Sequence, residues 1–161
     1  MHFWFSLNNK VRDVAQPAGL LLLRLWLAQE FMLAGYRKLS SGLTAPEWFA
    51  GLPFPFPVSL LPADLNWVLA GGGEIILALL LALGWLGIVA PAGLLFITWV
   101  AVCSVHFDLG LAGWDQIESE DGLGFKVPLM MAVMLFTLLA TGMGRWSIDQ
   151  LWQRRLQAPT V

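Results

Sequence analysis

The stretch LLLRLWLAQEFMLAGYRKL at residues 21–39 decides the fold class. It is apolar enough for lipid, yet Arg24 and Glu30 lie in its middle and Arg37 and Lys38 at its end. At about 100° per residue, the four charges fall on one face of a helix, opposite a mostly apolar face. A charge near the bilayer centre is tolerated when it faces a bundle interior or a wet cavity. We therefore predict a membrane helix whose charged face points inward.

The composition of the whole chain agrees with this prediction. With 58% hydrophobic and 12% charged residues and a mean hydropathy of +0.70, these 161 residues are too apolar for an ordinary soluble domain. A transmembrane helix needs roughly 20 apolar residues. Four segments qualify, at about residues 18–38, 64–84, 88–107 and 127–143. We predict an all-α fold, a four-helix transmembrane bundle at residues 18–146, flanked by interfacial pieces at 1–17 and 147–161.

The distribution of basic residues predicts an orientation. With four spans both termini lie on one side, and that side carries more Lys and Arg than the other. The two sets are Lys10, Arg12, Arg145, Arg154 and Arg155 against Arg37, Lys38 and Lys126. The excess predicts a multi-pass protein of a bacterial inner membrane with cytoplasmic termini. The first apolar run lacks a cleavage site of small residues, so we expect it to be retained.

The composition also limits the classes of partner that we expect. The net charge is −2 and no basic cluster is interleaved with aromatic residues, so we expect membrane lipid and no nucleic acid as partners. Cys103 is the only cysteine, which excludes an internal disulfide and a thiolate-rich metal site. A protein partner in the periplasm or membrane is expected, and a homo-oligomer is compatible with a narrow four-helix protomer.

Depth along the helices predicts a polar cluster. Counted from the outer surface at about 1.5 Å per residue, Glu30 and Glu74 lie at similar depth, and the long side chain of Arg24 can reach either. His106 at the end of the third helix falls in the same outer half. We therefore expect Arg24 to face Glu74 or Glu30 in one shielded, outward-opening cluster.

Each of these residues also has a simpler reading. Arg24 can form an ion pair that only fixes helix packing. Arg37 and Lys38 can extend to the membrane surface, and His106 can be an ordinary interface residue. The residues of Cys103-x-x-His106 with Met130 and Met134 can hold Cu(I), or the methionines can simply pack. The acidic loop at 108–126 is either solvated or a docking surface.

Three sequence features form a recognisable set. The spacing R-x(6)-F-x(3)-G-x-x-K and a mid-helix glutamate are followed by G-x-G-x-x-S-x-D. The residues that meet them are Arg24, Phe31, Gly35 and Lys38, then Glu74, then Gly142, Gly144, Ser147 and Asp149. With these residues, the chain resembles the DoxX family of four-helix inner-membrane proteins over about residues 18–152. The long loop before the fourth helix and Val105-His106-Phe107-Asp108 look more like its HvfX-like branch.

This resemblance implies a redox-linked role. Members include quinone-reactive subunits of thiosulfate oxidation, and the HvfX-like branch is associated with maturation of copper-binding ribosomal peptides. We hypothesise an oxidoreductase-associated subunit that binds a quinone, with copper ranked behind it as a cofactor and no metal ligands assigned; whether the chain is itself an enzyme stays open. The residues expected to act are Glu74, Arg24, Glu30 and His106 in catalysis, and Arg24, Lys38, Glu74 and Arg37 in quinone binding. The alternative is a non-enzymatic accessory for assembly or export of a peptide or metal carrier.

Overall fold

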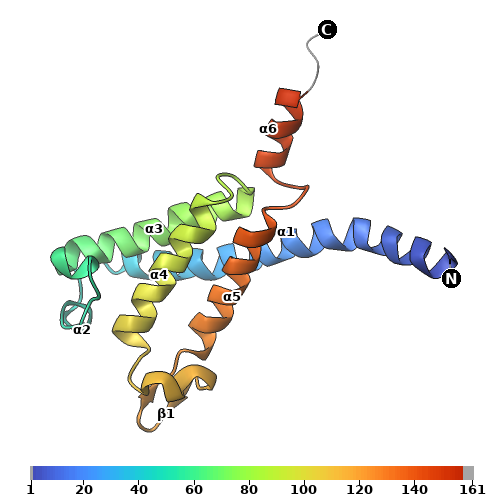
Figure 1. Cartoon of the computed structure of the whole chain (residues 1–161). Helices are drawn as coiled ribbons and strands as arrows, with labels where there is room; N and C mark the ends of the chain where they lie inside the picture. Colours follow the sequence, from blue (N-terminus) through green and yellow to red (C-terminus); the bar gives the residue numbers. More distant parts are fainter. Residues whose placement is uncertain (1, 158–161) are drawn as a thin grey trace.

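The computed structural model describes residues 2–157, with side chains from residue 12 onward. The chain is mostly helical, as predicted (Figure 1). The four long helices are α1 His2–Ser40, α3 Ala63–Leu83, α4 Val89–Val105 and α5 Lys126–Thr141. The last residues of the C-terminal tail, 158–161, lie outside the described part.

Short elements occupy the connections. Between α1 and α3 lie α2 Glu47–Ala50 and the 3-10 turn η1 Val58–Leu60. Between α4 and α5 lie the 3-10 turn η2 Gly110–Asp115 and a small antiparallel hairpin of β1 Glu118–Ser119 and β2 Gly122–Leu123. In the hairpin, Glu118 pairs with Leu123. After α5, the helix α6 Ile148–Gln157 points away from the others (Figure 1).

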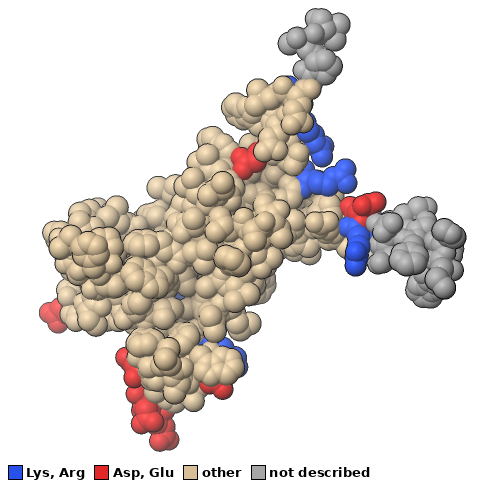
Figure 2. Space-filling view, viewed as in Figure 1, with Lys and Arg blue, Asp and Glu red and all other residues tan. Residues whose placement is uncertain are grey.

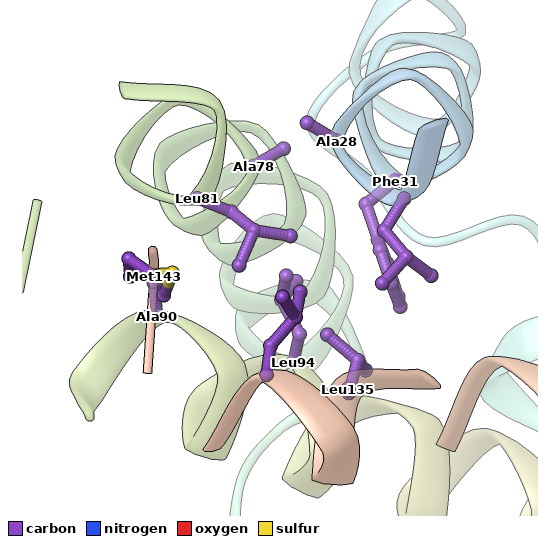
Figure 3. Close-up of a cluster of buried hydrophobic side chains, with 10 residues drawn as sticks. Ala28, Phe31, Ala78, Leu81, Ala90, Leu94, Leu135 and Met143 are labelled. Carbon is purple, nitrogen blue, oxygen red and sulfur yellow. The ribbon is translucent and has the colours of Figure 1, made fainter. Parts of the chain in front are cut away.

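The helices form two antiparallel pairs. The α1 residue Gly35 lies against Gly71 of α3, while Arg24 lies beside Gly84 at the other end of α3, so these helices run in opposite directions. In Figure 1, α4 and α5 lie side by side and cross the α1–α3 pair obliquely. Side chains from all four helices meet in one apolar core (Figure 3). It contains Leu27, Ala28, Phe31, Ala78, Leu81, Ala90, Leu94, Leu135, Leu138 and Met143.

The surface of the helices is apolar. Large hydrophobic side chains of α1, α3, α4 and α5 stay exposed, whereas charged side chains gather toward the ends of the molecule in Figure 2. Soluble monomers rarely expose apolar patches of this extent. Within the described residues, two helices are long and apolar enough to cross a bilayer, Arg12–Ser40 and Ala63–Leu83. The other two apolar helices, Val89–Val105 and Lys126–Thr141, are shorter.

The first helix is longer than predicted. We expected it to begin at about residue 18, but α1 begins at His2 and continues through Pro17 to Ser40. Proline removes one backbone hydrogen bond from a helix interior, and α1 nevertheless continues without a break. In Figure 1 the N-terminal half of α1 extends beyond the other helices. The structure describes no side chains for residues 1–11. Most of the predicted interfacial piece 1–17 therefore lies outside the described side chains.

The connection between α1 and α3 is tied to the start of α3. The helix α3 begins at Ala63, and Oδ1 of Asp64 accepts a hydrogen bond from the Ala45 N–H at 2.8 Å. The segment around α2 folds back onto α3. The rings of Phe49 in α2 and Trp67 in α3 lie 4.9 Å apart, and Phe49 is buried. Residues 45–61 therefore cover one end of α3.

Candidate functional site: an apolar cavity beside a buried ion pair

Arg24 is fully engaged at one end of the bundle. Its side chain is 1% exposed, and its guanidinium donates four hydrogen bonds, all to backbone carbonyls. The acceptors are the oxygens of Leu81 (3.1 Å), Ala82 (2.8 Å), Met143 (2.6 Å) and Trp146 (3.1 Å). A cation suits this position because the last carbonyls of α3 carry the negative end of its dipole. We call this set of contacts the Arg24 cluster.

The Arg24 cluster is extended by Asp149 at the start of α6. Its carboxylate accepts hydrogen bonds from the backbone N–H groups of Leu86 (3.2 Å) and Gly87 (2.8 Å) in the turn between α3 and α4. Gly84 in the same turn has φ +66, and a Cβ there would lie 2.8 Å from Nη1 of Arg24. Thus α1, the α3–α4 turn and the segment after α5 are joined at one point.

Glu74 pairs with Lys38, not with Arg24. Nζ of Lys38 lies 2.7 and 2.8 Å from the two carboxylate oxygens of Glu74, whose side chain is 7% exposed. This is the one ion pair found among the residues whose side chains are described. The expected contact of Arg24 with Glu74 or Glu30 is wrong. The guanidinium instead donates its hydrogen bonds to carbonyls, among them those of Leu81 and Ala82 at the C-terminal end of α3.

The register between α1 and α3 explains the error. A Cβ on Gly71 would meet the side chains of Leu39 and Lys38 at 3.0–3.2 Å, so Gly71 lies level with the end of α1. From Ala63 to Gly71, α3 therefore extends about 12 Å beyond α1. The depth prediction took Lys38, at the end of α1, and Asp64, at the start of α3, to lie at the same level. It therefore placed Glu74 too deep relative to Glu30.

Beside the ion pair lies an apolar cavity of about 510 Å³, which we call the main cavity, and a larger but more polar hollow of about 650 Å³ lies near Leu86 and Gln153. The main cavity is enclosed by α3, α4 and the folded segment at residues 48–61, and its walls are mostly apolar. Both Lys38 and Glu74 line it. The apolar walls include Phe54, Leu69, Leu77, Phe96, Ile97 and Val100. This volume lies in the range of small-molecule and cofactor sites.

Two buried polar atoms of residues that line the cavity lack protein partners. Oγ of Ser104 and Nδ1 of His106 are buried and make no hydrogen bond within the described part of the chain. Ser104 is 7% exposed, and both residues line the cavity at the end of α4. Buried polar groups are normally hydrogen-bonded, since leaving one unpaired costs about 1–3 kcal/mol. Both atoms are therefore unsatisfied within the wall of the cavity.

The remaining predicted residues lie elsewhere. Glu30 is half-buried on α1, and Arg37 is exposed; neither lines the main cavity. Cys103 is exposed, whereas His106 lines the cavity and Met134 packs against the core. Among the described residues, no group of three or more His, Cys, Asp and Glu side chains is placed to hold a metal ion. The catalytic role of Glu30 and the quinone-binding role of Arg37 stay predictions.

The sequence interpretation missed Ser104 and the cover of the cavity. A single serine near the end of an apolar helix has no distinctive spacing, although its neighbour His106 marked that helix end. The cover residues Phe49 and Phe54 have no distinctive spacing either, because the contacts of Phe49 with Phe54 and with Trp67 form only in three dimensions.

The chain is similar to a described protein family and to a bacterial protein. Residues 19–107 match the family model described as DoxX. A protein of Haemophilus influenzae (strain Rd), described as an uncharacterized protein, is 36% identical over 144 residues, which is 88% of each chain. No solved structure matches the chain.

Proposed function

Because this chain belongs to the DoxX family of membrane proteins, we propose that it binds a quinone headgroup in the main cavity and works as a redox-linked subunit with a partner protein. The observation that carries this proposal is the cavity itself. It combines apolar walls with a buried ion pair and two unpartnered polar atoms.

The cavity residues match the chemistry of a quinone. A quinone headgroup is a flat apolar ring with two carbonyl oxygens that accept hydrogen bonds. The hydroxyl of Ser104 and the imidazole of His106, when its Nδ1 carries the proton, can donate to one of them. Lys38 has three N–H donors, and Glu74 has two oxygens to accept from them, so one donor can turn to the ligand. The apolar walls suit the ring and its tail.

The chemistry also requires protons and electrons. Interconversion of quinone and quinol moves two electrons and two protons. Glu74, Lys38 and His106 are titratable groups at the cavity and can take up or release the protons. The electrons would come from, or pass to, a redox centre carried by the partner protein.

We place the protein in the bacterial inner membrane as a four-helix bundle with both termini in the cytoplasm. At 1.5 Å per residue, α4 with 17 residues and α5 with 16 residues are about 25 Å long, slightly shorter than the roughly 30 Å hydrocarbon core. Local thinning of the bilayer accommodates such a mismatch at modest cost. We also propose the HvfX-like branch, and a role beside copper-binding peptide maturation, because of the His106 segment and the long loop before α5.

The test is a binding titration with a short-tailed ubiquinone analogue. The purified protein in lipid nanodiscs is titrated, and tryptophan fluorescence or calorimetry reports binding. Ser104→Ala is the sharpest variant, because it removes an unpartnered buried hydroxyl and should leave stability unchanged or slightly raised. We expect this variant to bind about 3–10-fold more weakly, the value of one hydrogen bond. Glu74→Gln should also weaken binding.

The matched control is Lys126→Gln, which removes a charge from an exposed side chain at the start of α5. It should bind like the unchanged protein. Absence of binding to the unchanged protein, or affinities equal in Ser104→Ala, Glu74→Gln and Lys126→Gln, would refute the proposal.

The accessory alternative is favoured by a different observation. The segment between α4 and α5 is folded, with Asp108 accepting a hydrogen bond from the Leu123 N–H at 3.1 Å, yet it exposes Leu111, Trp114 and Ile117. Such a surface suits docking of a carrier. Co-purification of a partner that is lost when residues 110–124 are shortened, with quinone binding absent, would support the alternative over the redox role.

A further inference from the structure

α6 is held firmly at its start but covered by nothing along its length. Oγ of Ser147 accepts a hydrogen bond from the Gln150 N–H at 3.3 Å, and the carboxylate of Asp149 accepts hydrogen bonds from the α3–α4 turn. From Leu151 onward every described residue of α6 is exposed, and Leu156 is 75% exposed. The direction of α6 is therefore fixed while its sides remain free.

The free sides of α6 are strongly amphipathic. At about 100° per residue, Ile148, Leu151, Trp152 and Leu156 fall within an arc of about 140°, and the three glutamines of α6 fall on the opposite side. Arg155 lies within the apolar arc, and Arg154 lies about 60° beyond its edge. An amphipathic helix of low overall hydrophobicity that also carries arginines is typical of helices that lie in a membrane interface.

The charge around α6 is basic. Arg154 and Arg155 lie on α6, and Arg145 lies in the linker before it, where it borders a hollow with Asp13 of α1. The acidic side chain of α6, Asp149, is turned to the α3–α4 turn. The opposite end of the molecule is different, because Asp and Glu side chains gather below α4 and α5 (Figure 2).

The position of α6 also fits a bilayer surface. The start of α6 lies near three helix ends. At this level α3 ends at Leu83, α4 begins at Val89 and α5 ends at Thr141. Three apolar helices thus end or begin beside α6, where a bilayer around them would have its headgroups.

We propose that α6 is a binding element for anionic phospholipid headgroups. Its apolar arc enters the headgroup boundary, and Arg154 and Arg155 pair with lipid phosphates. Charge complementarity selects this occupant, since each basic residue near an anionic membrane contributes about 1 kcal/mol of attraction. This proposal does not depend on the quinone cavity.

The test compares amide hydrogen exchange of α6 in nanodiscs of two compositions. One contains only phosphatidylcholine and the other also contains phosphatidylglycerol. A helix of ten residues frays in water, so lipid contact should slow its exchange. We expect slower exchange at residues 148–157 with phosphatidylglycerol, an effect reduced by high salt. The double variant Arg154→Gln with Arg155→Gln should lose up to about 30-fold of this protection.

Lys126→Gln, at the opposite end of the bundle, is the matched control and should keep the full effect. Equal protection in the two lipids, or an effect unchanged in the double variant, would overturn the proposal. Protection that rises with protein concentration at fixed lipid would overturn it as well, because it would assign the apolar arc to a second copy of the chain. Loss of quinone binding has no bearing on any of these readouts.

Discussion

Replacing Arg24 should damage the stability of the protein more than any ligand-binding property. The guanidinium donates four hydrogen bonds to carbonyls of α3 and of the segment after α5, and it is almost completely buried. A hydrogen bond to a charged group contributes about 1.5–3 kcal/mol, but four bonds from one group are not additive. We therefore expect Arg24→Gln to lose about 3–5 kcal/mol, a large share of the stability of a domain.

The conservative variant sharpens this prediction. Arg24→Lys keeps the positive charge at the end of α3, but an ammonium group lacks the planar fork that reaches carbonyls on two segments at once. We expect an intermediate loss of about 2 kcal/mol. The measurement is denaturant-induced unfolding in mixed detergent micelles, with hydrogen exchange at residues 143–149 reporting whether the Arg24 cluster has opened.

The control is Arg37→Gln on the same helix, where the side chain is exposed and the change should stay within about 0.5 kcal/mol. If Arg24→Gln is as stable as this control while it abolishes quinone binding, the structural role of Arg24 is refuted and the residue belongs to the ligand site.

Two further sets of substitutions test the contact between α1 and α3. Lys38→Met or Glu74→Met alone should cost about 2–3 kcal/mol in the same unfolding assay, below the 3–5 kcal/mol of a fully buried pair, since Lys38 keeps 23% exposure. The double variant should recover most of the loss; additive losses would contradict a direct pair. Gly35→Ala should cost about 1–3 kcal/mol, because its Cβ would lie 2.5 Å from the Gly71 oxygen, whereas Gly72→Ala meets nothing within 4 Å and should be neutral or stabilising. Equal stability of the two alanine variants would contradict the close approach.

Helix type was predictable from the sequence, and helix register was not. Long apolar runs marked α1 and α3, because a membrane helix depends on local composition. The vertical offset of α1 against α3 depends on the close approach of Gly35 to Gly71, where the determining feature is an absent side chain. No count of residues from the helix ends can supply that offset.

The partners of the charged residues were equally hard to infer. Glu74 was correctly identified as an inward residue, but its partner is Lys38, which had been given interfacial extension as its simpler reading. For Arg24, the partners are carbonyls, and a backbone carbonyl has no residue-specific signature. A buried arginine therefore suggested a carboxylate partner, although the ends of α3 and α5 offered unpaired acceptors.

The distance between Arg24 and Lys38 explains why a single shared site was the wrong expectation. Fourteen residues separate them, which is about 21 Å along a helix, so they share a face of α1 but not a depth. Arg24 meets the last turn of α3, whereas Lys38 meets Glu74 in its middle. The family spacing from Arg24 to Lys38 thus serves two purposes, one at each end. Because the ends are separate, substitutions at Arg24 test the assembly of the bundle, and substitutions at Ser104 or Glu74 test the cavity within an intact bundle.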